Sequence, residues 1–185
     1  MCGFSCSLDR PGPAILGLLP ETATTDGAIL LSGTDVLTAS PQKLRHMRGS
    51  DVSMVFQEPS TALNPVYPVG WQIAEGLRAH NPKMGKKAMR ARVVEAMEKV
   101  GIPNASERHD YYPHQFSGGQ KQRIVIAMAL ALGAKLIVAD EPTTALDVTV
   151  QAEILDLLRD LRDRMDTAIV LITHNMGVVA DLADR

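Results

Sequence analysis

Two short apolar runs in the second half of the chain constrain the fold more than any other feature. The runs cover residues 136–139 and 168–173, and neither contains a charged residue. Helical patterns over 119–132 and 149–165 precede and separate them. Continuous apolar strands that alternate with helices are typical of parallel strands covered on both faces. The sequence therefore predicts an α/β fold with a layered sheet.

The first part of the chain shows weaker signals of the same kind. Residues 28–32 and 52–56 are predicted to form short strands. Between them, Ser40 and Pro41 form a typical N-cap and first helical position, and Gly49 is suited to end that short helix. The start of the chain is interrupted by prolines, so we expect no regular helix there.

The middle of the chain has the character of an insertion. Residues 58–82 contain four prolines around a candidate helix over 71–80. An amphipathic helix over 86–100 follows, and Gly101 ends it. Its basic residues suit a solvated helix face, and docking of a partner is the alternative.

Composition excludes several classes of protein. The chain has 185 residues, which suits one domain, and its formal net charge of −2 does not suit a nucleic-acid coat. The most apolar stretch, 124–139, is interrupted by Lys135 and is shorter than the roughly 20 residues that cross a bilayer. Cys2 and Cys6 have no partners at metal-ligand spacing. Without a secretory signal in residues 1–20, we expect a cytosolic chain.

Two adjacent carboxylates follow the first apolar run. Asp140 and Glu141 lie where ligands bind in open α/β sheets, at the carboxyl end of a strand. The first carboxylate can hold Mg²⁺, and the second can orient and deprotonate an attacking water. A capped turn before a helix is the structural alternative.

A glycine-containing turn precedes the helical pattern over 119–132. Ser117, Gly118, Gly119 and Gln120 place a hydroxyl and unobstructed backbone amides at a helix N-terminus. Such a terminus attracts phosphate, because its free N–H groups and the helix dipole both favour an anion. The alternative is a plain serine N-cap after a flexible turn.

Two further polar residues follow predicted strands. His174 comes after the run 168–173, where its ring can contact a phosphate or a water, and Gln57 comes after the strand 52–56, where its amide can reach a metal or a water. Each residue alone is a weak signal, because polar residues are common at strand ends.

Taken together and in this order, these motifs resemble those of the ATP-binding subunits of ABC transporters. Residues 116–123 resemble the family's signature motif, and 136–141 resemble its Walker B strand with Glu141 as the catalytic glutamate. Residues 144–147, which end in Asp147, resemble the D-loop. His174 resembles the switch histidine and Gln57 the glutamine of the Q-loop.

The segments 56–65 and 112–115 are similar to those of the subfamily that imports oligopeptides, dipeptides and nickel. The resemblance implies an ATPase subunit that couples ATP hydrolysis to import of a peptide or nickel. The sequence does not distinguish among these substrates, because their recognition lies with the partner subunits.

The resemblance implies a P-loop NTPase-like core with an inserted helical subdomain. The expected division is an unrelated, disordered N-terminus over 1–13, a partial ATPase core over 14–57 and 116–185, and a helical signature subdomain over 58–115. The implied cofactors are ATP and Mg²⁺. Asp140 and Gln57 are the implied metal ligands, and Glu141 and His174 are the implied catalytic residues. The implied nucleotide contacts are Gln57, Ser117, Gly118, Gly119, Gln120 and Asp147.

The resemblance also implies partners. In ABC dimers the signature of one subunit completes the ATP site of the other, so a second ATPase subunit is expected, in a homodimer or a heterodimer. Transmembrane permease subunits are expected to contact the helical subdomain through a coupling helix, and an extracytoplasmic solute-binding protein acts indirectly. These partners place the chain peripherally on the cytoplasmic face of the plasma membrane. No nucleic-acid partner is expected.

One motif of the family has no counterpart in this sequence. Family members hold phosphate with a Gly-x-x-Gly-x-Gly-Lys-Ser/Thr loop, the Walker A motif. The one Gly-Lys pair, Gly85-Lys86, is followed by Lys87. Residues 17–20 also resemble the subfamily, and counting back from them places the missing loop on about residues 2–9, where Leu8 and Asp9 replace the lysine and the hydroxyl residue.

We therefore expect negligible ATP affinity for this chain alone. About four charge-assisted phosphate contacts are missing, which removes on the order of 6 kcal/mol, whereas micromolar binding is worth about 8 kcal/mol. Isothermal titration of the 185-residue chain with Mg-ATP should show no micromolar binding, and a micromolar dissociation constant would contradict the expectation.

Three alternatives accompany this interpretation. The chain is also suited to be a non-catalytic subunit that donates its signature to an intact partner, or a remnant fragment of an importer gene. The third alternative, a soluble ABC ATPase of translation or DNA repair, is disfavoured by the segment 60–65 and by the absence of coiled-coil heptads.

The resemblance also bears on stability. Since the family continues with further strands after 181–185, an open sheet edge and instability are expected.

Overall fold

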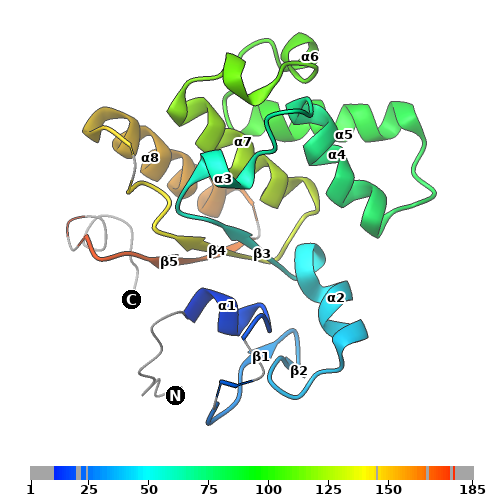
Figure 1. The fold of residues 1–185 in the computed structure, drawn as a ribbon, viewed down its shortest axis with the longest axis vertical. Coiled ribbons are helices and arrows are strands. Elements are labelled where there is room, and N and C mark those ends of the chain that lie inside the picture. The colour runs from blue at the N-terminus through cyan, green and yellow to red at the C-terminus, as the bar shows by residue number, and fades with distance from the viewer. Residues whose placement is uncertain are drawn as a thin grey trace.

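The computed structural model describes residues 11–19, 22–23, 25–144, 146–165, 167–175 and 177. Figure 1 shows a small sheet with long helices over one face and a short helix on the other. The expectations about Cys2, Cys6, Leu8, Asp9 and residues 181–185 lie outside the described residues.

Three parallel strands form the sheet. They are β3 (Val52–Val55), β4 (Leu136–Asp140) and β5 (Ala168–Ile172), in the order β3-β4-β5. The centre of β4 is completely buried, because strands flank it on both sides and side chains cover both of its faces. The predicted layered α/β fold is confirmed.

One face of the sheet is covered by α7 (Gly118–Ala131) and α8 (Val148–Arg164). Ile137 and Ala139 of β4 belong to the same buried cluster as the inner faces of these helices. The helix predicted over 149–165 is confirmed, and Ile154, Leu158 and Leu161 on its inner face are all buried. Aliphatic side chains dominate this core.

The opposite face carries α1 (Pro11–Ile15), visible below the sheet in Figure 1. Leu16, directly after α1, packs with Val52 and Val138. The expectation that prolines prevent a regular helix here is wrong, because residues 11–15 are helical. Pro11 and Pro13 both lie in the first turn of this helix. Backbone N–H groups there have no acceptor within the helix, so proline is tolerated. The division at residue 13 stays a prediction.

Strand β5 departs from the prediction that both apolar runs are covered on both faces. Its residues alternate between exposed and partly buried, and Val170 is 38% exposed. Within the described residues β5 pairs with β4 alone. Side chains cover both faces of β4 but leave one face of β5 partly open to solvent.

The N-terminal part contains the hairpin β1 (Leu30–Leu31) and β2 (Thr34–Asp35), followed by α2 (Pro41–Ser50). The strand predicted over 28–32 is therefore shorter than expected. Both turn residues between the strands have positive φ, as a two-residue hairpin turn requires. Hydrogen bonds from backbone N–H groups, first that of Leu37 and then that of Ile29, hold the pKa of Asp35 below its usual value.

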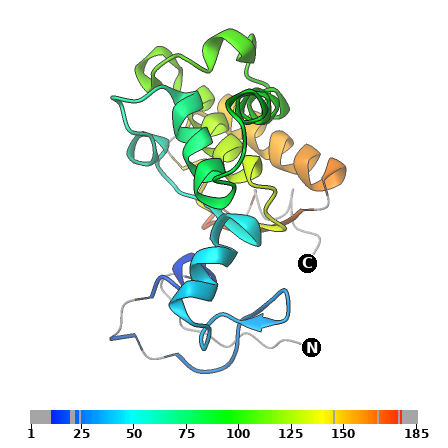
Figure 2. The same cartoon turned by 90° about the vertical axis from the view of Figure 1, so that its right-hand side faces the viewer.

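Helix α2 starts as predicted, with the Ser40 hydroxyl accepting the Lys43 N–H at 3.3 Å. It is interrupted at Gly49, whose φ is +91°. Figure 2 shows α2 between the hairpin and the helices of the insertion. A Cβ at this glycine would lie 2.6 Å from Leu132 Cδ1, so the close approach also requires glycine.

The insertion is helical. It contains α3 (Pro59–Ala62), α4 (Val69–His80), α5 (Lys86–Lys99), α6 (Ala105–Arg108) and the 3₁₀ turn η1 (Pro113–Gln115). The apolar stripe predicted on α5 is buried at Met89, Val93, Ala96 and Met97. These side chains join the α7 cluster, so the insertion shares the main core. The division at residues 58 and 115 stays a prediction.

Within the part of the chain that the structure describes, no helix has both the length and the apolar character needed to span a membrane.

Candidate functional site

The two predicted carboxylates lie at the carboxyl end of β4. Asp140 is the last residue of the strand, and Glu141 follows it with a φ of +47°. The Glu141 N–H donates to the Ile172 carbonyl at 2.8 Å, which extends the pairing with β5 by one residue. A left-handed backbone at a residue with a Cβ is strained, and such strain is concentrated at functional sites.

Both carboxylate oxygens of Glu141 have partners. Oε1 accepts the backbone N–H of His174 at 3.3 Å, and the His174 ring nitrogen Nε2 lies 3.6 Å from it. Oε2 accepts the hydroxyl of Thr144. The glutamate side chain is 16% exposed and the histidine side chain 98% exposed. The carboxylate is therefore held in one orientation, while the imidazole is accessible to a ligand.

Gln57 lies near the same edge of the sheet. It comes two residues after Val55, which pairs with Ala139, and it is exposed. The carboxyl ends of parallel strands meet at one edge, so the amide follows β3 at the edge where Asp140 and Glu141 follow β4. Carboxylate and amide oxygens suit Mg²⁺, which keeps waters and phosphate oxygens as its other ligands. The donor set therefore fits a nucleotide-bound Mg²⁺.

The predicted phosphate-binding turn starts α7 with a reciprocal cap. The Ser117 hydroxyl accepts the Gln120 N–H at 3.3 Å, and Gln120 Oε1 accepts the Ser117 N–H at 3.3 Å. The serine N-cap weighed as an alternative is therefore present. It is compatible with anion binding, because the first N–H groups of a helix have no partner inside the helix. In α7 these groups belong to Gly118 and Gly119.

The two glycines also bring α7 close to α8. A Cβ at Gly119 would lie 2.6 Å from Cγ1 of Val150, and one at Gly118 would lie 3.8 Å from Leu146. Asp147 caps α8, and its Oδ1 accepts the Val150 N–H at 3.0 Å. The starts of the two helices therefore lie side by side, and the segment 143–147 connects them to Glu141.

Sequence reasoning missed the residue that holds this segment. The side-chain amide of Gln151 donates to the carbonyls of Thr143 and Leu146, each at 3.0 Å. It also missed the Thr144 hydroxyl as a partner of Glu141. A glutamine in the first turns of an amphipathic helix carries no signal of such bonds, because its acceptors lie in the preceding loop.

We predict that Gln151→Leu loosens the segment 143–147. Two carbonyls lose their partly buried donor, so the free energy of unfolding should fall by about 1 to 2 kcal/mol. Amide exchange in the segment should accelerate while exchange in α5 stays unchanged. Gln151→Glu should be at least as damaging, because a carboxylate faces the same carbonyl oxygens without a donor. Unfolding in urea measures the difference, and wild-type stability in both variants would contradict the prediction.

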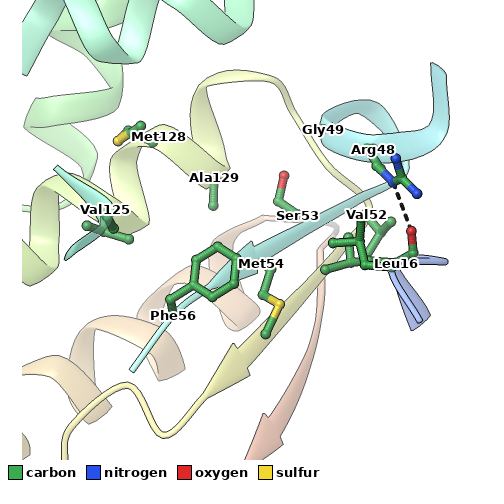
Figure 3. A pocket seen from close by; sticks show the side chains of 12 residues that line it. Leu16, Arg48, Gly49, Val52, Ser53, Met54, Phe56, Val125, Met128 and Ala129 are labelled. Carbon is green, nitrogen blue, oxygen red and sulfur yellow. Dashed lines mark hydrogen bonds between the residues drawn. The ribbon is translucent and has the colours of Figure 1, made fainter. Parts of the chain in front are cut away.

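A groove of about 330 Å³ runs along β3 on the side away from β4. Figure 3 shows Val125, Met128 and Ala129 of α7 on one side and Leu16 on the other. Arg48 Nε donates to the Leu16 carbonyl at 2.9 Å, which joins the walls at one end. The lining is largely apolar and includes Phe56, which is 48% exposed beside Gln57.

Comparison with known proteins identifies close relatives. The chain is 50% identical over 182 residues to the dipeptide transport ATP-binding protein DppD of Bacillus subtilis, covering 97% of this chain and 54% of that protein. It is 49% identical over 172 residues to the oligopeptide transport ATP-binding protein OppD of Mycobacterium tuberculosis, covering 93% of this chain and 28% of that protein. The chain thus spans about half or less of the length of these relatives.

Solved structures show the same fold. The cbiO1 structure from Clostridium perfringens, part of the ABC transporter complex cbiONQ, matches with a TM-score of 0.75 and 30% identity, covering 93% of this chain and 64% of that one. The dimeric ATP-binding cassette MJ0796 bound to ADP and Pi matches with a TM-score of 0.70 and 28% identity, covering 83% and 65%.

The family model described as ABC transporter matches residues 14–144, which is well over half of the chain. The matched range contains the signature turn at α7 and both strand-end carboxylates. The chain therefore belongs to the ABC transporter family.

Proposed function

We propose that the chain acts as the ATP-hydrolysing subunit of an importer for peptides or nickel. The observation that carries the proposal is the Glu141 carboxylate, held between the Thr144 hydroxyl and the His174 N–H at the carboxyl ends of two parallel strands. A fixed, partly buried carboxylate at this position suits a base that orients and deprotonates water. Identity of about half to dipeptide and oligopeptide transport proteins supports the substrate class.

Each site residue has a role in this proposal. Glu141 orients the water and accepts its proton, and the exposed His174 ring contacts the terminal phosphate. Asp140 and Gln57 would hold Mg²⁺, which neutralises charge on the phosphates when bound. The start of α7 provides donors to phosphate, and the residues concerned are Ser117, Gly118, Gly119 and Gln120. Asp147 keeps the neighbouring start of α8 in place.

The proposed partner of the α7 start is a nucleotide on a second ATPase subunit. The MJ0796 neighbour is a dimer bound to ADP and Pi, which supports this arrangement. Within this chain, the glycines of the turn lie against Leu146 and Val150, so the nucleotide would meet the turn and the D-loop together. The second subunit is either another copy of this chain, in a homodimer, or a different ATPase subunit, in a heterodimer.

The groove beside β3 is the proposed docking site for a helix of a transmembrane permease subunit. Its apolar walls and the half-exposed Phe56 suit an apolar side chain, and Gln57 follows directly. A partner seated here would contact the segment that leads to the proposed metal site. The proposal places the chain peripherally on the cytoplasmic face of the membrane, with the solute-binding protein as an indirect partner and no nucleic acid.

The test uses an assembly of this chain with permease subunits and a second ATPase subunit that carries a phosphate-binding loop. In proteoliposomes we expect Ser117→Ala to lower peptide-stimulated ATP hydrolysis about tenfold or more, because one contact to a charged phosphate is lost. Glu141→Gln should lower it about a hundredfold, because the base is lost. An effect of Ser117→Ala alone would favour the signature-donating alternative, and no effect of either would overturn the proposal.

We further predict that Phe56→Ala weakens permease association about tenfold, because an apolar anchor at a docking site carries much of the binding energy. Thermal stability should change little, since the Phe56 ring is 48% exposed. Leu30→Ala is the matched control, because Leu30 is 74% exposed and lies on the hairpin away from the groove. Co-purification with permease subunits measures association, and equal retention of both variants would contradict the prediction.

A further inference from the structure

Arg108, at the end of α6, reaches both sides of the turn that starts α7. Its guanidinium carbon lies 4.5 Å from the centre of the Phe116 ring and 5.8 Å from that of the Tyr111 ring. Its Nη2 donates to Gln120 Oε1 at 3.3 Å. Within the described residues Arg108 has no acidic partner, so rings and an amide are its contacts. A planar guanidinium suits this combination, because it stacks on a ring and donates at its rim.

These contacts brace the turn on both sides. Phe116 precedes Ser117 and is 5% exposed, which makes its ring a fixed base for the guanidinium. Gln120 follows the two glycines, and the Oε1 atom that accepts from Arg108 also accepts the Ser117 N–H at 3.3 Å. One side chain therefore orients the residue before the turn and the amide that closes its cap.

The segment that carries Arg108 also holds the start of α4. The Val69 N–H donates to the Tyr111 carbonyl and the Gly70 N–H to the His109 carbonyl, both at 2.8 Å. Helix α4 has no side-chain cap, so these carbonyls satisfy N–H groups that lack helical partners. The segment 108–111 thus joins the starts of α4 and α7, which lie about 50 residues apart in the chain.

We infer that Arg108 is a positioning residue for the turn 117–120, acting through Phe116 and Gln120. It keeps the side-chain amide of Gln120 in the cap. It also keeps the backbone N–H groups of Gly118 and Gly119 pointing in one direction. The consequence for phosphate binding rests on the proposed function. The geometric part does not, because it concerns contacts within this chain.

Amide exchange in the full chain tests the geometric part. In Arg108→Met the backbone N–H groups of Ser117 and Gln120 should exchange about tenfold faster, because the cap that protects them loses its contact with the guanidinium. Arg108→Lys keeps a cation near Phe116 and should recover at least half of the protection. Arg90→Met is the matched control, because Arg90 is exposed on α5 and, among the residues that the structure describes, its guanidinium donates only to the Ser106 carbonyl. This variant should leave the exchange of both backbone amides unchanged.

Two exchange results would overturn the inference. One is Arg108→Met with Ser117 and Gln120 exchange within about twofold of wild type. The other is an equal acceleration throughout the chain, including α8, because that would show a general loss of stability rather than positioning of the turn.

ATP hydrolysis by the assembly described above tests the consequence. Arg108→Met should lower hydrolysis about fivefold to tenfold, mainly by raising the KM for Mg-ATP, and Arg108→Lys should restore at least half. Loss of hydrolysis in Ser117→Ala but not in Arg108→Met would overturn the inference. If neither Ser117→Ala nor Glu141→Gln has an effect, the proposed function fails, and the exchange result alone decides whether Arg108 positions the turn.

Discussion

Replacing Gln122 with methionine is expected to stabilise the protein by about 1 to 3 kcal/mol, the cost of leaving buried polar atoms without partners. Gln122 lies in α7 and is completely buried, and neither its Nε2 nor its Oε1 has a hydrogen-bond partner within the described residues. Methionine fills a similar volume without polar desolvation. The free energy of unfolding in urea measures the effect.

Gln72 is the matched control, since it is also helical and buried, with 5% exposure. Its Nε2 donates to the carbonyls of Asn64 and Tyr67 at 2.9 and 2.8 Å, and its Oε1 accepts the Asn64 N–H at 2.9 Å. Gln72→Met should therefore destabilise by about 2 to 4 kcal/mol, because backbone groups lose their partners. If Gln122→Met and Gln72→Met change the free energy of unfolding equally, the difference in hydrogen bonding between the two glutamines is refuted. A stabilised Gln122→Met with reduced hydrolysis in the assembly would show that this amide is kept for function.

Gly70→Ala should lower the free energy of unfolding by about 2 to 4 kcal/mol, from overpacking and a lost hydrogen bond. A Cβ at this position would lie 2.6 Å from the His109 carbonyl oxygen and 2.9 Å from the His109 Cβ. The oxygen belongs to the backbone and accepts the Gly70 N–H, so it cannot move away without breaking that bond.

Gly76→Ala in the same helix is the control. The three nearest atoms to a Cβ there would belong to the side chain of Leu132, the first at 3.3 Å, and none of these three is a backbone atom. Alanine also favours a helix by about 1 kcal/mol over glycine, so this variant should equal or exceed wild-type stability. Thermal and urea unfolding separate the two, and a tolerated Gly70→Ala would show that the segment 108–111 does not fix the start of α4.

Local patterns predicted most of the elements. The buried stripe of α5 follows from apolar residues at helical spacing, and the caps of α2 and α7 follow from Ser40 and Ser117. The strand-end position of Asp140 and Glu141 follows from the apolar run before them. Each of these signals lies within a few residues, where periodicity and capping chemistry act.

Other features had no local signal. The partners of Gln151 and Arg108 lie in loops or across a turn, and nothing in the residue types announces them. The exposure of β5 was also not predicted, because an apolar run has the same appearance whether one or both of its faces are covered. The helix that begins at Pro11 was missed because the same proline is tolerated or excluded according to its helical position.

The sequence by itself determined the layered α/β class, the strand-end carboxylates, the turn 117–120 and the resemblance to ABC transporter ATPases. Tertiary structure decided which of these groups touch: Glu141 with Thr144 and His174, the α7 glycines with Leu146 and Val150, and Arg108 with Phe116 and Gln120. The physical reason is range. Periodicity and capping act within one or two turns, whereas contacts between segments depend on how whole elements pack around a shared core.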